Sequence, residues 1–264
     1  MVLCYSAGPS QPINVFDPIP YLARIRFAGP ADPNPETLRR LHLAHLRTVP
    51  FENLDISLGR QIVCEEKRIL FKVVELRRGG FCYELNGAFA ALLRALGYST
   101  TLLSARVSRA DGSASPEFDH LALRVDLDEP WLVDVGFGDS FLEPLPLRDG
   151  IEQEQHGRKF RITEAEGGMI VERQETTGQW KPQYQFTLVP RQLSEFGPRC
   201  HYHQTSPDSH FTQQRICTLA TPDGRISLSD LKFIRTSHAV REEHLLNDEA
   251  EWRVVLERDF GVKL

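Results

Sequence analysis

The hydrophobic pattern of this chain changes its period once, close to Gly97. Before that point apolar residues recur at helical spacing, and after it short apolar runs of β type alternate with turn residues. We therefore expect an α+β protein in which the first third is helical and the middle is built from strands.

Two helices are predicted in the first third. Asn34 is a suitable cap and Pro35 a suitable first helical residue, and apolar side chains follow at helical spacing. A second helix is predicted to begin near Cys82 and to end at Gly97. Its buried stripe consists of Leu85, Phe89, Leu92, Leu93 and Leu96.

Strands dominate the sequence after Tyr98, and this texture is typical of a barrel or a sandwich. The last part is mixed, with two short strands and a terminal helix that Asn247 can cap and Gly261 can end. The predicted strands are residues 101–107, 121–125, 131–135, 160–163, 169–173, 183–189, 216–219 and 226–228.

Composition excludes several classes of protein. The chain has 264 residues, 41% of them hydrophobic and 25% charged, which is ordinary for a globular enzyme. A net charge of −5 provides no broad basic surface, so nucleic acid is not expected as a partner. The start lacks a secretory pattern and no apolar run is long enough to span a membrane. Five scattered cysteines indicate reduced thiols, so we expect a cytoplasmic protein.

Cys82 is the candidate nucleophile. It follows Gly79 and Gly80 and opens the second predicted helix, where the helix dipole and unpaired N–H groups favour an anion. A free thiol with a pKa near 8.5 is only about 3% thiolate at pH 7, so it needs a base and a group that orients the base. A small core residue is the alternative reading of a cysteine at a helix start.

His120 and Asp134 are the candidate partners of Cys82. His120 begins an apolar strand after a loop-like stretch, and Asp134 interrupts the apolar run 131–135. An isolated buried carboxylate is costly, so Asp134 needs a partner, and an imidazole N–H is a suitable one. A backbone hydrogen bond is the alternative for Asp134. Together the three residues have the order and context of a Cys–His–Asp triad.

Seven segments in sequence order resemble successive signatures of the arylamine N-acetyltransferase family. One Arg-Gly-Gly-x-Cys motif alone would be a weak signal, but seven ordered segments that cover most of the chain from about Tyr21 to Phe233 are specific. The matching segments are residues 48–56, 78–86, 105–107, His120, 131–138, 202–211 and 217–224.

The resemblance implies an activity and an architecture. The family's triad corresponds to Cys82, His120 and Asp134, and an acetyl group passes from acetyl-CoA to the cysteine and then to an arylamine, arylhydrazine or arylhydroxylamine. This is a ping-pong reaction, associated with xenobiotic metabolism, and it uses no metal. The resemblance also implies a helical domain (1–97), a β-barrel domain (98–205) and an α/β lid domain (206–264) around a cysteine-protease-like catalytic core.

The resemblance assigns further residues to the two substrates. Positions that line the family's acceptor pocket correspond to Phe51, Val107, Phe137 and Phe141, although aromatic residues are more often plain core. Positions near the coenzyme correspond to Gly136, Gly138, Tyr202 and Asp208.

Three positions depart from the family pattern, and two others match a structural pair. Asp208 replaces a hydroxyl residue of another family member, and Pro116 and Glu117 replace small or hydroxyl residues before His120. Glu52 and Arg78 match a structural ion pair beneath the nucleophile.

Three other functions remain as alternatives. A cysteine hydrolase of transglutaminase or protease type uses the same Cys, His, Asp order and differs in whether water reaches the thioester. A metal-binding module could use Cys200, His201, His203 and His210, but their spacing fits no common zinc pattern. A catalytically inactive family member that only binds ligands is disfavoured by the intact triad.

Overall fold

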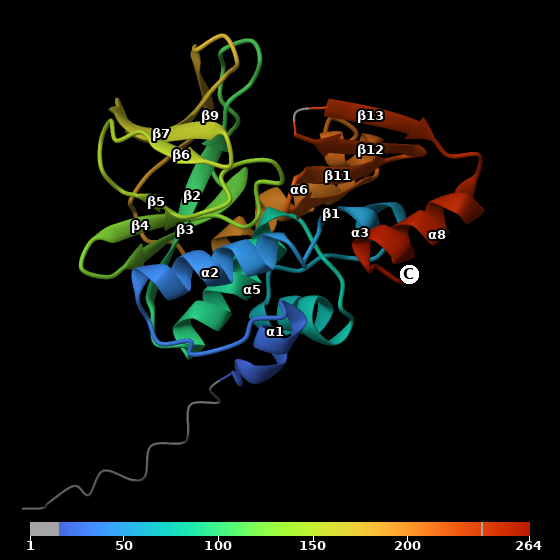
Figure 1. Cartoon of the computed structure of the whole chain (residues 1–264), viewed down its shortest axis with the longest axis horizontal. Coiled ribbons are helices and arrows are strands. Elements are labelled where there is room, and N and C mark those ends of the chain that lie inside the picture. Colours follow the sequence, from blue (N-terminus) through green and yellow to red (C-terminus); the bar gives the residue numbers. More distant parts are fainter. Residues whose placement is uncertain (1–15, 239) are drawn as a thin grey trace, which may run out of the picture.

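The computed structural model describes residues 16–238 and 240–264, and it places two sheets side by side above a group of helices (Figure 1). The helical part contains a π-helix, η1, directly after α4. Its elements are α1 (Ile19–Arg24), α2 (Pro35–Leu46), α3 (Leu54–Ser57), α4 (Glu66–Leu70), η1 (Phe71–Glu75) and α5 (Cys82–Ala95).

Helix α5 is the centre of the helical part. Its residues from Cys82 to Leu93 are all buried, because it packs against α4 on one side and against β2 and β3 on the other. Helix α2 begins as predicted, since the Asn34 side chain accepts the Thr37 N–H at 2.8 Å and Pro35 is the first helical residue.

The middle of the chain forms one eight-stranded antiparallel sheet in the order β5-β4-β3-β2-β9-β8-β7-β6. Contacts between β5 and β7 bring the two ends of the sheet together, so the sheet is a nearly closed barrel and not a sandwich. Its strands are β2 (Ser99–Val107), β3 (His120–Asp126), β4 (Pro130–Val133), β5 (Leu145–Pro146), β6 (Gln153–Gln155), β7 (Arg158–Ala165), β8 (Gly168–Gln174) and β9 (Trp180–Phe186).

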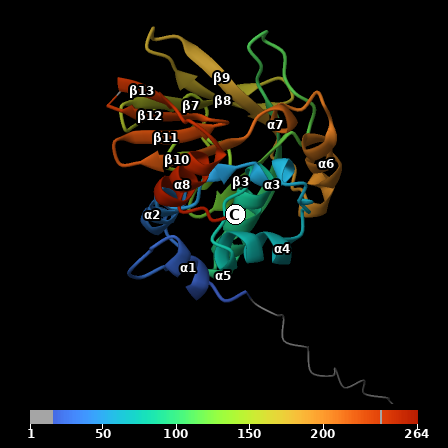
Figure 2. The ribbon, with the colours of Figure 1, turned by 90° about the vertical axis from the view of Figure 1, so that its right-hand side faces the viewer.

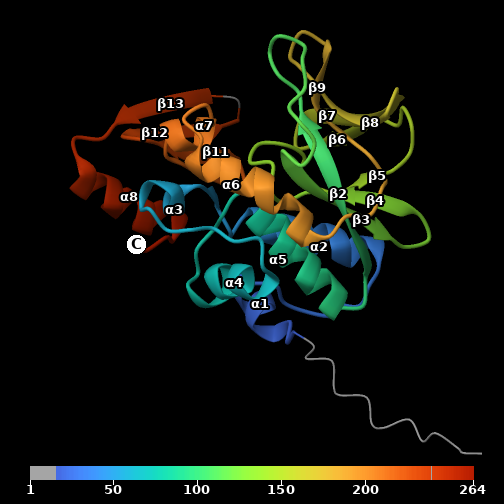
Figure 3. The ribbon, with the colours of Figure 1, turned by 180° about the vertical axis from the view of Figure 1, so that it is seen from behind.

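Helix α6 (Gly197–Thr205) crosses between the barrel and the second sheet, as Figure 3 shows from behind. The 3₁₀ helix η2 (Leu193–Phe196) precedes it and the short helix α7 (His210–Gln213) follows it. The C-terminal helix α8 (Glu249–Phe260) packs against β10, and the two face the viewer in Figure 2.

The second sheet has the order β1-β10-β11-β12-β13 and joins one strand of the helical part to four strands of the C-terminal part. Strand β1 is only Phe51–Glu52, yet it pairs with β10 and its Glu52 N–H also bonds to the Gly80 carbonyl at 2.9 Å. The loop before Cys82 is therefore tied to the C-terminal sheet. The other strands are β10 (Ile216–Thr221), β11 (Gly224–Ser229), β12 (Lys232–Ser237) and β13 (Val240–Leu245).

Two local predictions were wrong, and two strands were missed. Asp248, not Asn247, caps α8, because its carboxylate accepts the Glu251 N–H at 2.9 Å. Strand β4 ends at Val133, so Asp134 follows the strand instead of interrupting it. Strands β12 and β13 were not predicted, because the exposed residues of β13 have no apolar alternation. Within the described residues no helix has the length and apolar character needed to cross a membrane.

Candidate active site

The His120 and Asp134 side chains meet at the end of the barrel that faces α5. His120 is the first residue of β3, and its Nε2 lies 2.7 Å from Asp134 Oδ2. Both residues are 2% exposed. Because Nε2 is engaged by the carboxylate, Nδ1 is the ring nitrogen that remains for exchange with another group.

Asp134 is held as an anion by His120 and two neutral N–H donors. Its Oδ1 accepts the Asn86 side-chain N–H at 2.8 Å and the Gly136 backbone N–H at 2.9 Å. Burial alone raises the pKa of a carboxyl, but His120 and these donors together bring the pKa of Asp134 below its usual 3.8. The carboxylate is thus ionised at neutral pH and its orientation is set on both oxygens.

Cys82 is the first residue of α5 and is 5% exposed. The Leu121 backbone N–H points to its sulfur, which places the thiol beside the residue that follows His120. Gly136 lies on the other side: a Cβ there would sit 2.8 Å from the Cys82 Cα, so only glycine allows this approach. The three predicted triad residues are therefore gathered at one place.

Burial changes the expected chemistry of the thiol. The sequence suggested that the helix start favours the thiolate, but burial raises the pKa of Cys82 well above its usual value and outweighs the opposing Leu121 N–H. A nucleophile in this position needs to give its proton to a base as it reacts. His120 with its carboxylate partner is such a base.

His42 on α2 supports Asp134 from behind. Its Nδ1 lies 2.8 Å from the Leu142 carbonyl, and its Nε2 lies 3.0 Å from the Asp134 carbonyl and 3.3 Å from the Asp134 backbone nitrogen. Burial lowers the pKa of His42 to about 4, so the ring is neutral and donates its single N–H to one of these two carbonyls. The ring also stacks on Phe141 at 5.8 Å.

The predicted acceptor residues occupy three different environments. Phe137 packs edge-on against the His120 ring at 5.2 Å, and Phe51 lies half-buried beside Gly138. Val107 ends β2 and is half-buried. Phe141 is 1% exposed and packs between His42 and Phe160, so its visible role is in the core. Contact of these four residues with an acceptor stays a prediction.

The predicted coenzyme residues form two groups. Gly136 and Gly138 lie in the loop after Asp134, next to Cys82 and Phe51. Tyr202 lies on α6 with the Arg199 guanidinium 3.9 Å from its ring centroid, and Asp208 is exposed in the turn after α6. His203, once considered as a metal ligand, lies 3.0 Å from the Asp119 carboxylate. Among the described residues no three His, Cys, Asp or Glu side chains form a metal site.

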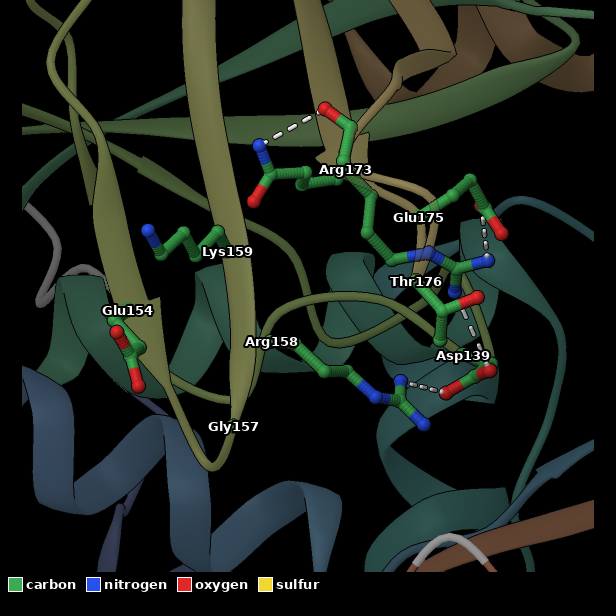
Figure 4. A pocket seen from close by; sticks show the side chains of 10 residues that line it. Asp139, Glu154, Gly157, Arg158, Lys159, Arg173, Glu175 and Thr176 are labelled. Carbon is green, nitrogen blue, oxygen red and sulfur yellow. Dashed lines mark hydrogen bonds and ion pairs between the residues drawn. The ribbon is translucent and has the colours of Figure 1, made fainter.

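Three arginines hold the far end of the loop that carries Gly136. Asp139 lies 2.6 Å from Arg158 of β7, 3.1 Å from Arg225 of β11 and 3.6 Å from Arg173 of β8. Figure 4 shows Arg158 and Arg173 turned toward Asp139 beside a cavity of about 500 Å³. These contacts join the barrel, the C-terminal sheet and the loop after Asp134.

Two site residues, Asn86 and His42, were not assigned from the sequence. Asn86 bonds Asp134, the Leu121 carbonyl at 2.6 Å and the Val135 N–H at 2.9 Å. A signal was available for each, since both are polar residues within apolar helical stripes. Asn86 also stands one turn after Cys82, on the same face of α5.

Comparison with known proteins places these features in a family. The family model described as N-acetyltransferase matches residues 34–264. The arylamine N-acetyltransferase of Escherichia coli is 36% identical over 249 residues, which cover 92% of this chain and 87% of that protein. The proansamycin X synthase of Amycolatopsis mediterranei is 30% identical over 256 residues, with 93% and 97% covered. The structure of Mycobacterium marinum arylamine N-acetyltransferase in complex with CoA superposes with a TM-score of 0.86 at 30% identity, with 93% of each chain covered.

Proposed function

Because the chain belongs to the arylamine N-acetyltransferase family, we propose that it transfers an acetyl group from acetyl-CoA to an arylamine, arylhydrazine or arylhydroxylamine. The proposed intermediate is a thioester on Cys82. The observation that carries the proposal is the buried 2.7 Å contact between His120 and Asp134 at the end of the barrel that faces Cys82. Acetyl-CoA as donor and a free thiol as nucleophile suit a reducing compartment, so the proposed location is the cytoplasm.

The first half-reaction forms the thioester. The Cys82 thiol gives its proton to His120 Nδ1 as the sulfur attacks the acetyl carbonyl of acetyl-CoA. The imidazolium that forms is stabilised by the Asp134 carboxylate. The bond between the acetyl carbon and the coenzyme sulfur then breaks, and CoA leaves with the proton from His120.

The second half-reaction uses the same residues. The amine attacks the thioester carbonyl, its proton passes to His120, and the Cys82 sulfur leaves and takes that proton back. We propose that Phe51 and Phe137 contact a flat aromatic acceptor, since their rings lie beside Gly138 and His120. Gly136, Gly138, Tyr202 and Asp208 are the proposed coenzyme contacts.

A mass spectrum of the protein after a brief exposure to acetyl-CoA, without acceptor, tests the thioester. One acetyl group per chain is expected, and peptide mapping should place it on Cys82. Cys64→Ser is the matched control, because it removes another thiol and should still be labelled. Label on Cys64 or Cys200, or normal turnover in Cys82→Ala, would overturn the proposal.

Steady-state kinetics separate a transferase from a hydrolase. The transferase gives parallel double-reciprocal lines, and aniline raises the rate of CoA release well above its amine-free level. A hydrolase instead releases acetate steadily without any amine. Because one relative is named as a synthase of a different product, the acceptor is tested across aniline, phenylhydrazine and a non-aromatic amine. Only the aromatic compounds are expected to accelerate release.

A further inference from the structure

Five charged side chains lie together behind the first turn of α5, and we call them the charge cluster. All are buried, with exposed fractions between 0% and 8%. Three carboxylates face two cations, which leaves one net negative charge. The members are Glu52, Asp55, Lys72, Arg78 and Glu84.

Lys72 occupies the middle of the charge cluster. Its Nζ lies 2.7 Å from Glu84 Oε1 and 2.7 Å from Asp55 Oδ2. Arg78 instead contacts Glu52 at 2.8 Å and Asp55 at 3.1 Å. Among the described residues, Lys72 is thus the cation in contact with Glu84. Lys72 belongs to the π-helix η1, a rare wide turn that often occurs at functional sites.

Glu84 connects this charge to the nucleophile. Its Oε2 accepts the Phe81 backbone N–H at 3.2 Å, the reciprocal bond of a capping box, and Phe81 directly precedes Cys82. A Cβ on Gly80 would lie 2.6 Å from the same oxygen, so the carboxylate packs directly against the backbone of the loop. The position of the Glu84 carboxylate therefore sets the chain direction into Cys82.

We propose that Lys72 is a positioning residue for Cys82: it holds the Glu84 carboxylate against the Phe81 N–H and thereby fixes the first turn of the nucleophile helix. The inference rests on the proposed function in one respect, that Cys82 is the reacting group.

The physical reason is that Lys72 determines the protonation state of the Glu84 carboxyl. Burial raises the pKa of Glu84 to about 7, with Glu52 and Asp55 acting in the same direction and Lys72 acting against them. Without Lys72 the buried carboxyl keeps a proton, and its new O–H needs an acceptor. The Asp55 carboxylate, which has also lost Lys72, offers one. When the protonated Glu84 carboxyl moves toward Asp55, it moves away from the Phe81 N–H.

Protons can reach this carboxyl. A cavity of about 440 Å³ is lined by Lys72, Asp55, Arg78 and Glu84, on the side of α5 away from the barrel. Glu84 therefore titrates with the solvent, and its effect on Cys82 depends on pH.

The test is the rate at which iodoacetamide alkylates Cys82, followed by peptide mapping from pH 7 to 9. Lys72→Met should lower the rate at pH 7 by about tenfold, because a misplaced reacting group is costly. Glu84→Gln should change it by about twofold or less, since glutamine also forms a capping box. The double variant has no carboxyl at position 84 whose proton would draw it toward Asp55, so the rate should recover to within about threefold of the native rate.

The pH dependence of the alkylation rate distinguishes a positioning role of Lys72 from a general loss of structure in the variant. The Lys72→Met deficit should shrink as the pH rises, because Glu84 ionises again and returns to the Phe81 N–H. Lys72→Arg, which keeps the charge, should react at nearly the native rate, and it covers the case in which Lys72→Met fails to fold. Lys67→Met is the matched control, since Lys67 is exposed one turn earlier and should have no effect.

A double variant as slow as Lys72→Met, or a Lys72→Met rate equal to the native one, would overturn the inference. Alkylation needs no acetyl-CoA, so the outcome is independent of whether the protein proves to be a transferase. A native protein that alkylates normally but is not acetylated contradicts the proposed function and leaves this result intact.

Discussion

Two groups of buried polar residues flank α5, and they stabilise their buried carboxylates in different ways. On the barrel side, His42, Asn86, His120 and Asp134 form a group with a single carboxylate, which His120 and two neutral N–H donors keep ionised. We call it the catalytic cluster. On the other side, the charge cluster balances its anions with cations at 2.7–3.1 Å.

Because of this difference, the two groups contribute to stability with opposite dependence on pH. The pKa of His42 is lowered to about 4, so its contribution to stability is complete above pH 6.5 and is lost as the pH falls toward 4. The pKa of Glu84 is raised to about 7, so its contribution is complete below pH 4.5 and is lost as the pH rises through 7. His42 therefore stabilises the folded protein at high pH, and Glu84 stabilises it at low pH.

The largest effect is expected for Asp134→Asn. An amide nitrogen facing His120 Nε2 forces the imidazole to carry its proton on Nδ1, where it cannot accept one from Cys82. Acylation should fall on the order of 10²- to 10⁴-fold, as in serine triads. Rapid-quench measurement of CoA release checks this, with thermal unfolding as the folding control. A folded variant with near-native rates would make Asp134 purely structural.

Arg78→Met should act on stability. It leaves Glu52, which has no exposed surface, without its closest cation, and breaking a buried ion pair costs about 3–5 kcal/mol. Urea unfolding measures the change. Arg241→Met, which breaks an exposed pair with Glu243, is the control and should cost less than about 1 kcal/mol. Equal losses in both would remove the contrast between buried and exposed pairs.

The pH response separates the clusters. Between pH 6.5 and 5, protonation of the unfolded His42 should lower the free energy of unfolding by about 2 kcal/mol, and His42→Gln should remove that part of the slope. Glu84→Gln should steepen the slope, because it deletes the opposing contribution. Urea unfolding at several pH values provides the measurement. Parallel slopes in all three proteins would contradict the opposite signs.

The smallest effect is expected at Asp139. Its side chain is 44% exposed, so the three arginine contacts are screened, and Asp139→Asn should cost about 1 kcal/mol or less. Because Asp139 anchors the loop that carries Gly136 and Gly138, the KM for acetyl-CoA should rise by about two- to threefold at most, with kcat nearly unchanged. A large loss of kcat would instead assign Asp139 to the catalytic cluster.

The sequence predicted part of each cluster: His120 and Asp134 in the catalytic cluster, and the Glu52–Arg78 ion pair in the charge cluster. Asp134 stands out because a polar residue in an apolar run needs a partner, and the family resemblance located His120, whereas Asn86 and His42 were missed. Lys72 gave no such signal, since a lysine in a helical segment is normally exposed. Only the three-dimensional fold shows that α4 and η1 turn it inward against α5.

Sheet edges were hard to predict for a different reason. Strand β13 exposes every residue, so it lacks the alternation that marks a strand. Strand β1 has two residues, and its pairing depends on a partner far along the chain. The confirmed α+β class rests on the long periodic segments. The division into domains at 97/98 and 205/206 stays a prediction.

Strand β1 also has a consequence for the order of assembly during synthesis. Phe51 pairs with Thr218, and Glu52 lies opposite Cys217 and donates its backbone N–H to the Gly80 carbonyl. Contacts between such distant residues form late, because the loop between them must close first. A ribosome-bound chain that has not yet passed Thr221 therefore lacks the strand that completes the nucleophile loop. The loop before Cys82 can take its final structure only after β10, which ends at Thr221, has emerged.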